Sequence, residues 1–283
     1  MYVPKGGVLF FDSGIGGLTV LAECRKRLPA ATFYYYGDNA RAPYGNLPSE
    51  QIERYVLEIF EDLERLRPSA AVIACNTATA VCADTLRKKY SFPIVGAEPA
   101  VLSAAKAGGE IFVLATKATV ESERFQTLSD RTLKTYPNAN VHPFACEVLA
   151  GTIEKHLTDR DFDFSSLLPN GNPASVVLGC THYVFIKEQI QSFYKAPTYD
   201  GNAGIAKRLC HFVDNFPNPL YGLNCGEPFS AGEKETTNRD ERPLPTTSLF
   251  PARIHFLGSE KEYNRRIFEQ MFAKSGNKRG LGG

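Results

Sequence analysis

Short apolar segments alternate with amphipathic helical segments along most of the chain, and this alternation restricts the fold strongly. The expected strands cover residues 8–11, 33–36, 70–74, 94–95, 111–115, 141–146, 175–178 and 254–257. The expected helices cover residues 18–28, 52–66, 77–90, 119–136, 147–157, 183–194 and 260–272. Strands that alternate with helices predict parallel sheets, because a helix then carries the chain back between parallel strands. We therefore expect an α/β fold with helices on both faces of each sheet.

Length and charge narrow the class of protein. The chain has 283 residues, of which 43% are hydrophobic, and this length fits two domains of ordinary size or one large α/β unit. Its formal net charge is +1, so no basic excess points to a nucleic-acid partner. No apolar run approaches the roughly 18 residues of a membrane helix, and the first residues lack the layout of a signal peptide. These features predict a cytoplasmic protein that binds neither nucleic acid nor membrane.

The cysteines predict thiols rather than a disulfide framework. There are seven of them, an odd number, and no two form a CxxC pair. The usual environment of a thiol is a buried apolar one. That is the expectation for Cys24, Cys82, Cys146, Cys210 and Cys225.

Four predicted strands end at a reactive or polar side chain, and two of these ends resemble each other. The four residues are Asp12, Asp38, Cys75 and Cys180. Ligands bind at the carboxyl ends of parallel strands, so we expect a site there. AAVIACNT contains Cys75 and SVVLGCTH contains Cys180, and each joins an apolar strand, a cysteine and a helix. A helix N-terminus favours a thiolate, and His182 follows Cys180 closely enough to favour or relay its charge.

Two thiols in equivalent settings indicate an acid and a base on opposite sides of one substrate. Racemisation at a Cα atom requires this arrangement, because one face loses a proton while the other gains one. Thiols suit the task, since their ordinary pKa is about 8.5. We expect backbone N–H groups at the two helix starts, with Asn76, Thr77 and Thr181, to bind the substrate carboxylate. Asp12, with Ser13 beside it, is the expected partner of the substrate ammonium.

Other interpretations of these segments are weaker. DSGIGG does not fit the GxGxxG phosphate-binding pattern, and an aspartate would repel a phosphate. Asp38 has an equally good interpretation as a helix or turn cap. No cluster of histidine, cysteine and carboxylate residues has the spacing of a metal site, and no lysine has a setting that specifies a pyridoxal Schiff base. We therefore expect neither a metal nor an organic cofactor.

The chain contains, in this order, the motifs FDSGIGGLTVL, YYGDNARAPYG, ACNTATA, PIVGAEPA, ATKATVES and GCTHY. In these motifs and their order the sequence resembles the glutamate racemases, members of the aspartate/glutamate racemase superfamily. The resemblance covers roughly residues 8–200 and resumes at RIHFLGS. It implies two three-layer α/β domains that face each other across a cleft, with the second inserted in the first. The expected division is 1–97 plus 208–283 for the first domain and 98–207 for the second.

The resemblance also implies a function and a set of residues. It implies a cofactor-independent racemase that supplies D-glutamate for peptidoglycan, with glutamate as its partner, and a homodimer remains open. By motif, the acid/base residues are Cys75 and Cys180, and Asp38 and Glu154 are candidate assisting groups. His182 and Asp12 belong to the catalytic set. The implied substrate contacts are Asp12, Ser13, Tyr44, Gly45, Asn76, Thr77, Thr181 and His182.

Several segments depart from the family pattern. CEVLAGTIE stands where the family usually has something like CPLFVPLVE, which leaves the role of Glu154 open. YDGNAG replaces a segment that usually carries DSG, and residues 215–251 form a longer loop or insertion than usual. Neither thiol motif is affected.

The alternative functions are an aspartate racemase or another member of the superfamily, and a binding protein without activity. The presence of both thiols disfavours a decarboxylase that uses one.

Overall fold

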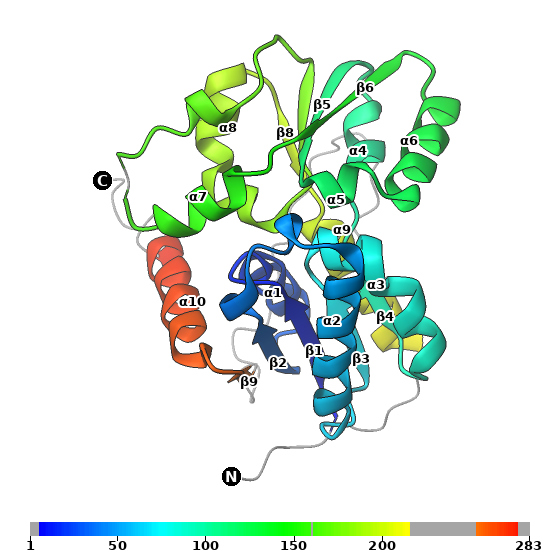
Figure 1. The fold of residues 1–283 in the computed structure, drawn as a ribbon, viewed down its shortest axis with the longest axis vertical. Helices are drawn as coiled ribbons and strands as arrows, with labels where there is room; N and C mark the ends of the chain where they lie inside the picture. Colours follow the sequence, from blue (N-terminus) through cyan, green and yellow to red (C-terminus); the bar gives the residue numbers. More distant parts are fainter. Residues whose placement is uncertain (1–5, 160, 216–252, 277–283) are drawn as a thin grey trace, which may run out of the picture.

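The computed structural model describes residues 6–159, 161–215 and 253–276, and these form two parallel sheets (Figure 1). The first sheet has the order β4-β3-β1-β2-β9, and the second has the order β6-β5-β7-β8. The first comprises β1 (Val8–Asp12), β2 (Thr32–Gly37), β3 (Ala70–Ile73), β4 (Ile94–Gly96) and β9 (Arg253–Leu257). The second comprises β5 (Gly109–Ala115), β6 (Ala139–Ala145), β7 (Ser175–Leu178) and β8 (Thr198–Asp200). All seven strand pairings are parallel, which confirms the predicted α/β class.

Helices cover both faces of each sheet because successive strand residues point to opposite faces. In β1, Leu9 and Phe11 enter one core cluster, whereas Val8 and Phe10 enter another. The first half of the molecule contains α1 (Gly17–Arg27), α2 (Ser49–Glu64), α3 (Asn76–Lys89), α9 (Asn202–Asn215) and α10 (Lys261–Gly276). The second contains α4 (Val101–Ala105), α5 (Lys117–Val120), α6 (Glu123–Thr135), α7 (Leu149–Lys155) and α8 (Lys187–Tyr194). Short 3-10 helices are η1 (Asn39–Arg41), η2 (Tyr44–Asn46), η3 (Ser165–Leu167) and η4 (Thr181–Ile186).

Two expected helices differ in the structure. The helix predicted over residues 119–136 is divided into α5 and α6, because the Ser122 hydroxyl accepts a hydrogen bond from Phe125 N and begins a new helix. The helix predicted over 183–194 begins as the 3-10 helix η4 and becomes α-helical only at Lys187. Residues 198–215, for which no element was predicted, form β8 and α9. The stretch 216–251 lies outside the described residues.

The chain passes between the two sheets after β4 and returns after β8. Helix α9, which follows β8, packs on α1 and on strands β3 and β4 of the first sheet. The expected domain boundary between residues 207 and 208 falls inside this helix. We propose that the second domain instead ends before α9, at about Gly201, and begins after β4 at about Ala97. On this division α9 belongs to the first domain, with which it packs.

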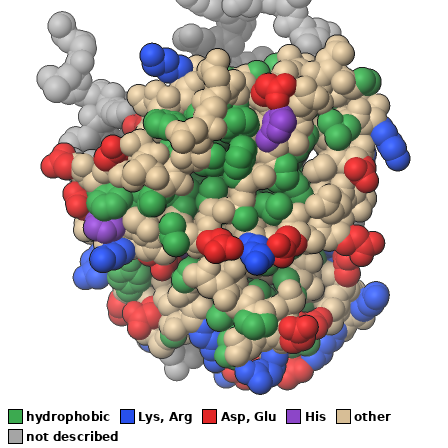
Figure 2. All heavy atoms as spheres, turned by 45° about the horizontal axis from the view of Figure 1, so that its top comes forward, with side chains coloured by type: hydrophobic (Ala, Val, Ile, Leu, Met, Phe, Trp, Pro, Cys, Tyr) green, Lys and Arg blue, Asp and Glu red, His purple; other side chains and the backbone are tan. Residues whose placement is uncertain are grey.

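The charges on the surface and the length of the helices bear on the classes of partner considered above. On the face drawn in Figure 2, acidic and basic side chains are interspersed. Within the described ranges, no helix is long and apolar enough to cross a membrane.

Candidate active site

The ends of strands from the two sheets meet in one place. Asp12 is the last residue of β1, Cys75 follows β3 by two residues, and Cys180 follows β7 by two residues. The Thr181 hydroxyl, from the second half, donates to Asp12 Oδ1 in the first over 3.4 Å. Asp12, Thr181 and both thiols are buried, between 0% and 8% exposed. The expectation that these strand ends form one site therefore agrees with the geometry.

Cys75 lies among groups with opposite effects on its ionisation. Its Sγ atom is 3.4 Å from Ser13 Oγ and accepts a 3.4 Å hydrogen bond from Ala78 N. Burial and the negative charge of Asp12 raise the pKa of Cys75 to about 12, although hydrogen bonds from Ser13 and Ala78 lower it. The charge of Cys180 adds to the increase in the pKa of Cys75, so the two sulfurs are close enough to interact.

Cys180 begins a chain of three side chains. Its Sγ atom is 3.7 Å from His182 Nδ1, and His182 Nε2 is 2.7 Å from Glu154 Oε1. His182 is 2% exposed, so this carboxylate is its partner in place of water. Burial alone would lower the pKa of His182, but the hydrogen bonds to Cys180 and Glu154 raise it well above its usual range. The His182 ring therefore lies between a carboxylate and the Cys180 sulfur, where it can exchange a proton with that sulfur.

The two thiol motifs differ in their local structure, which corrects the expectation that they are equivalent. Cys75 is the N-cap of the α-helix α3, and its side chain accepts from Ala78 N in the first turn. Cys180 is the N-cap of the 3-10 helix η4, and its side chain makes no cap hydrogen bond. The polar partner of the Cys180 sulfur is thus the His182 ring rather than a helix N–H group.

Asp12 and the loop after it are fixed by buried hydrogen bonds. Gly14 N donates to Asp12 Oδ2 over 3.0 Å, and the Tyr35 hydroxyl donates to Gly14 O over 2.7 Å. Burial raises the pKa of Asp12, partly offset by the charge of His182. A Cβ atom at Gly14 would lie 2.4 Å from Glu154 Oε1, so only glycine allows this approach. Tyr35 was not predicted from the sequence, because a bond to a carbonyl 21 residues away leaves no local signal.

Asp38 faces Tyr44 rather than the thiols. The Tyr44 hydroxyl donates to Asp38 Oδ2 over 2.6 Å, and Arg41 Nη1 lies 3.1 Å from the same oxygen. Asp38 occupies the N-cap position of η1, as the alternative interpretation expected, but its side chain makes no cap hydrogen bond. Burial and the hydrogen bond to Asp38 raise the pKa of Tyr44 well above its usual range, and the charge of Cys75 contributes. Asp38 is therefore connected to the Cys75 side of the site through Tyr44.

The residues after Cys75 meet the second half of the molecule through hydroxyl groups. Thr77 Oγ1 lies 2.9 Å from Thr116 Oγ1, which lies 3.0 Å from Thr119 Oγ1. Gly45 packs directly against Thr116, since a Cβ atom there would be 2.7 Å from Thr116 Cγ2. Neither Thr116 nor Thr119 was predicted as a site residue, although Thr116 directly follows β5 in the same way that Asp12 ends β1.

The other cysteines of the described ranges make none of the hydrogen bonds given above for Cys75 and Cys180. All six cysteines in the described ranges are buried thiols, and Cys225 lies outside those ranges. Among the described residues, no group of three or more histidine, cysteine or acidic side chains is arranged to hold a metal ion.

A cavity of about 910 Å³ lies between the two halves, lined by η2, the start of α2, α3 and α5. Gly45 is among its lining residues, so it is a candidate route to the buried site.

Comparisons with known proteins point to one family. The Asp/Glu/Hydantoin racemase family model matches residues 19–209. A glutamate racemase of Clostridium botulinum is 37% identical over 216 residues, which is 73% of this chain and 83% of that protein. Escherichia coli glutamate racemase in complex with L-glutamate and the activator UDP-MurNAc-ala is similar at a TM-score of 0.68 and 31% identity, covering 75% of this chain and 84% of that one. Campylobacter jejuni glutamate racemase is similar at a TM-score of 0.69 and 27% identity, covering 94% of this chain and 98% of that one.

Proposed function

This chain belongs to the Asp/Glu/Hydantoin racemase family and is an amino-acid racemase, and we propose that it interconverts L- and D-glutamate with Cys75 and Cys180 as its two acid/base groups. The observation that carries the mechanism is that short contacts link two buried thiols from different sheets. Ser13 Oγ lies 3.4 Å from the Cys75 sulfur, and Asp12, next to Ser13, accepts a 3.4 Å hydrogen bond from Thr181, the neighbour of Cys180. The choice of glutamate rests on the named relatives.

The reaction needs only proton transfers. On one face, a thiolate removes the Cα proton and becomes a thiol, which leaves a carbanion. On the other face, the second thiol donates its proton to that carbanion and becomes a thiolate. The substrate is inverted, and the two sulfurs have exchanged protonation states. Exchange of protons with water, or turnover of the opposite enantiomer, restores the first state. Because the chain supplies both groups, the proposed reaction requires no organic cofactor and no metal.

The environments of the sulfurs support different tasks at rest. Burial and Asp12 raise the pKa of Cys75, which favours its thiol form. The His182 ring, paired with Glu154, lies beside the Cys180 sulfur, where it can exchange a proton with that sulfur. On this proposal Cys75 begins a turnover as the acid and Cys180 as the base. Turnover of either enantiomer then exchanges the two roles.

Groups around the sulfurs support substrate binding. The side chain of Asn76 has a buried carbonyl oxygen that accepts no hydrogen bond within the described part of the chain, so it is available to the substrate ammonium. Backbone N–H groups at the starts of α3 and η4, with Thr77 and Thr181, are suited to a carboxylate. Ser13, Tyr44 and Gly45 complete the proposed contacts.

The proposed roles of the acidic residues follow from their partners. Asp12 is fully buried and already accepts from Gly14 and Thr181, which favours a role in the charge balance of the thiols over direct contact with the ammonium. Glu154 maintains the charge of His182, and Asp38 orients Tyr44. The product, D-glutamate, would serve peptidoglycan synthesis in the cytoplasm.

Replacement of single thiols tests the proposal. We expect Cys75→Ala and Cys180→Ala each to abolish racemisation from either enantiomer, because every turnover needs an acid and a base. Cys82→Ala is the matched control, since Cys82 is buried in α3 like Cys75 but outside the site. Circular dichroism of L- and D-glutamate incubated with each variant follows the reaction. Full activity without Cys75 or without Cys180 would contradict the proposal.

A further inference from the structure

Helix α3 links the proposed acid/base residue Cys75 to the other half of the molecule. Cys75 is the N-cap of α3, and the helix packs on strands β3 and β4 of its own sheet. On its other side, α3 contacts α5 and α6 of the second half. Any shift of α6 relative to α3 therefore changes the position of Cys75 relative to Cys180.

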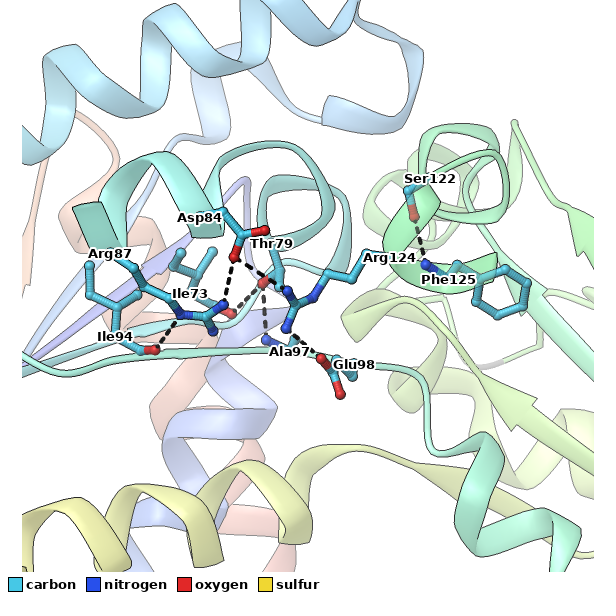
Figure 3. Close-up of polar contacts among 10 residues, drawn as sticks. All are labelled: Ile73, Thr79, Asp84, Arg87, Ile94, Ala97, Glu98, Ser122, Arg124 and Phe125. Carbon is cyan, nitrogen blue, oxygen red and sulfur yellow. Dashed lines mark hydrogen bonds and ion pairs between the residues drawn. The ribbon is translucent and has the colours of Figure 1, made fainter. Parts of the chain in front are cut away.

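An arginine of the second half joins these elements at a distance from the thiols. Arg124 Nη2, on α6, lies 2.5 Å from Glu98 Oε1, and its Nη1 atom lies 3.6 Å from Asp84 Oδ1 on α3. Figure 3 shows Arg124 reaching from α6 toward Asp84 and Glu98. Its side chain is 28% exposed, less than either carboxylate partner. The guanidinium thus connects α6 to two separate segments of the first half.

Glu98 lies where the chain passes between the sheets. It follows β4 and precedes α4, and the returning chain approaches it at Gly201. A Cβ atom at Gly201 would be 2.8 Å from Glu98 O, so the two connections between the halves touch at this point. Through its ion pair with Glu98, Arg124 attaches α6 to the connection between the two halves.

Helix α3, which carries Asp84, is hydrogen-bonded to the strands β3 and β4, and β3 leads to Cys75. Asp84 also pairs with Arg87 over 3.0 Å, and Arg87 Nε donates to Ile94 O of β4 over 3.3 Å. One turn nearer the site, Thr79 Oγ1 donates to Ile73 O and accepts from Ala97 N, each over 3.0 Å. Ile73 is two residues before Cys75. These hydrogen bonds connect helix α3 to the ends of β3 and β4, next to Cys75 (Figure 3).

We propose that Arg124 is a positioning residue that sets the approach of Cys75 to Cys180, by fixing α6 both to α3 and to the connection at Glu98. This inference rests on the proposed two-thiol racemisation. Arg124 acts through the placement of α3 and touches neither sulfur. Exposed ion pairs contribute little to stability, whereas a misplacement of about 1 Å costs on the order of a hundredfold in rate. The contact therefore affects catalysis more than folding.

The test compares Arg124→Met, Arg124→Lys and Lys89→Met. Lys89→Met is the matched control, because Lys89 on the same helix pairs with Glu61 of α2 inside the first half. For each variant, kcat and the primary isotope effect with α-deuterated L-glutamate are measured, together with the thermal midpoint. We expect Arg124→Met to lower kcat about tenfold and to increase the isotope effect, since poorer alignment makes proton transfer slower. Arg124→Lys keeps one ion pair and should be intermediate, and Lys89→Met should match the wild type.

Other outcomes would overturn the inference. These are an unchanged kcat for Arg124→Met, a lower kcat with an unchanged isotope effect, or an equal effect of Lys89→Met. Partial unfolding would lower kcat without changing the isotope effect, which separates it from misalignment. Should Arg124→Met fail to fold, Glu98→Gln decides by the same measurements. An inactive wild type would refute the proposed function instead.

Discussion

His182 Nε2 lies 2.7 Å from Glu154 Oε1, and the other ring nitrogen faces the sulfur of Cys180. The two residues are 28 positions apart and come from different elements, α7 and η4, which pack on each other. This contact makes the environment of Cys180 different from that of Cys75, whose partners are a hydroxyl and a helix N–H group.

Glu154→Gln tests the part of this contact in catalysis. The pKa of His182 is raised by its bonds to Cys180 and Glu154, so loss of the Glu154 charge should lower that pKa. The imidazolium would then be lost at lower pH. We expect kcat/KM to fall at least about tenfold, and the alkaline limb of its pH profile to move to lower pH. Glu188→Gln, an exposed change on α8, should leave the profile unchanged. A fixed alkaline limb in Glu154→Gln would exclude His182 as its source.

We expect Asp12→Asn to be less active than the wild type but more stable at alkaline pH. Burial raises the pKa of Asp12 above its unfolded value, so the stabilisation by this carboxyl is complete below its unfolded pKa and is lost as pH rises through its folded pKa. As pH rises, ionisation of this buried carboxyl increasingly destabilises the folded wild type, whereas the amide of the variant does not ionise. We expect a higher thermal midpoint for Asp12→Asn at that pH, a smaller difference near about pH 4, and at least about a tenfold loss of activity.

Asp163→Asn is the control of opposite sign for this measurement. Hydrogen bonds from Ser165 lower the pKa of Asp163, so its stabilisation is present above its unfolded pKa and is lost as pH falls through its folded pKa. The thermal midpoint of Asp163→Asn should therefore not rise at about pH 8. A lower midpoint for Asp12→Asn at that pH would mean that the Asp12 carboxylate stabilises the fold.

The sequence was sufficient to predict parallel sheets and to single out the strand ends that lie together at the candidate site. Strand periodicity and the residue types at positions 12, 75 and 180 are local signals, and the structure agrees with them. The 3-10 form of Thr181–Ile186 was not predictable, because its apolar spacing also fits an α-helix and its packing on α1 and α7 comes from distant segments. Contacts such as Tyr35 to Gly14 depend on the register of β1 and β2, which sequence alone does not specify.

Glutamate should be turned over much faster than aspartate. The site must hold an ammonium, a carboxylate and a second carboxylate at a fixed distance from the Cα atom. One CH₂ fewer would leave donors unpaired or move the Cα atom off the line between the sulfurs. We expect kcat/KM for aspartate to be lower by on the order of a hundredfold under the same conditions. Equal values, or a preference for aspartate, would indicate an aspartate racemase while leaving the thiol mechanism in place.

The most direct test of the two-thiol account is the isotope content of the first product formed in deuterium oxide. L-glutamate with protium at the Cα atom is incubated with the enzyme, and D-glutamate isolated at low conversion is analysed by mass spectrometry. With separate groups on opposite faces, the proton removed by one sulfur cannot return to the other face. The account therefore predicts deuterium at the Cα atom of essentially every D-glutamate molecule from the start. Early D-glutamate that retains the original protium would contradict it, because one group would then serve both faces.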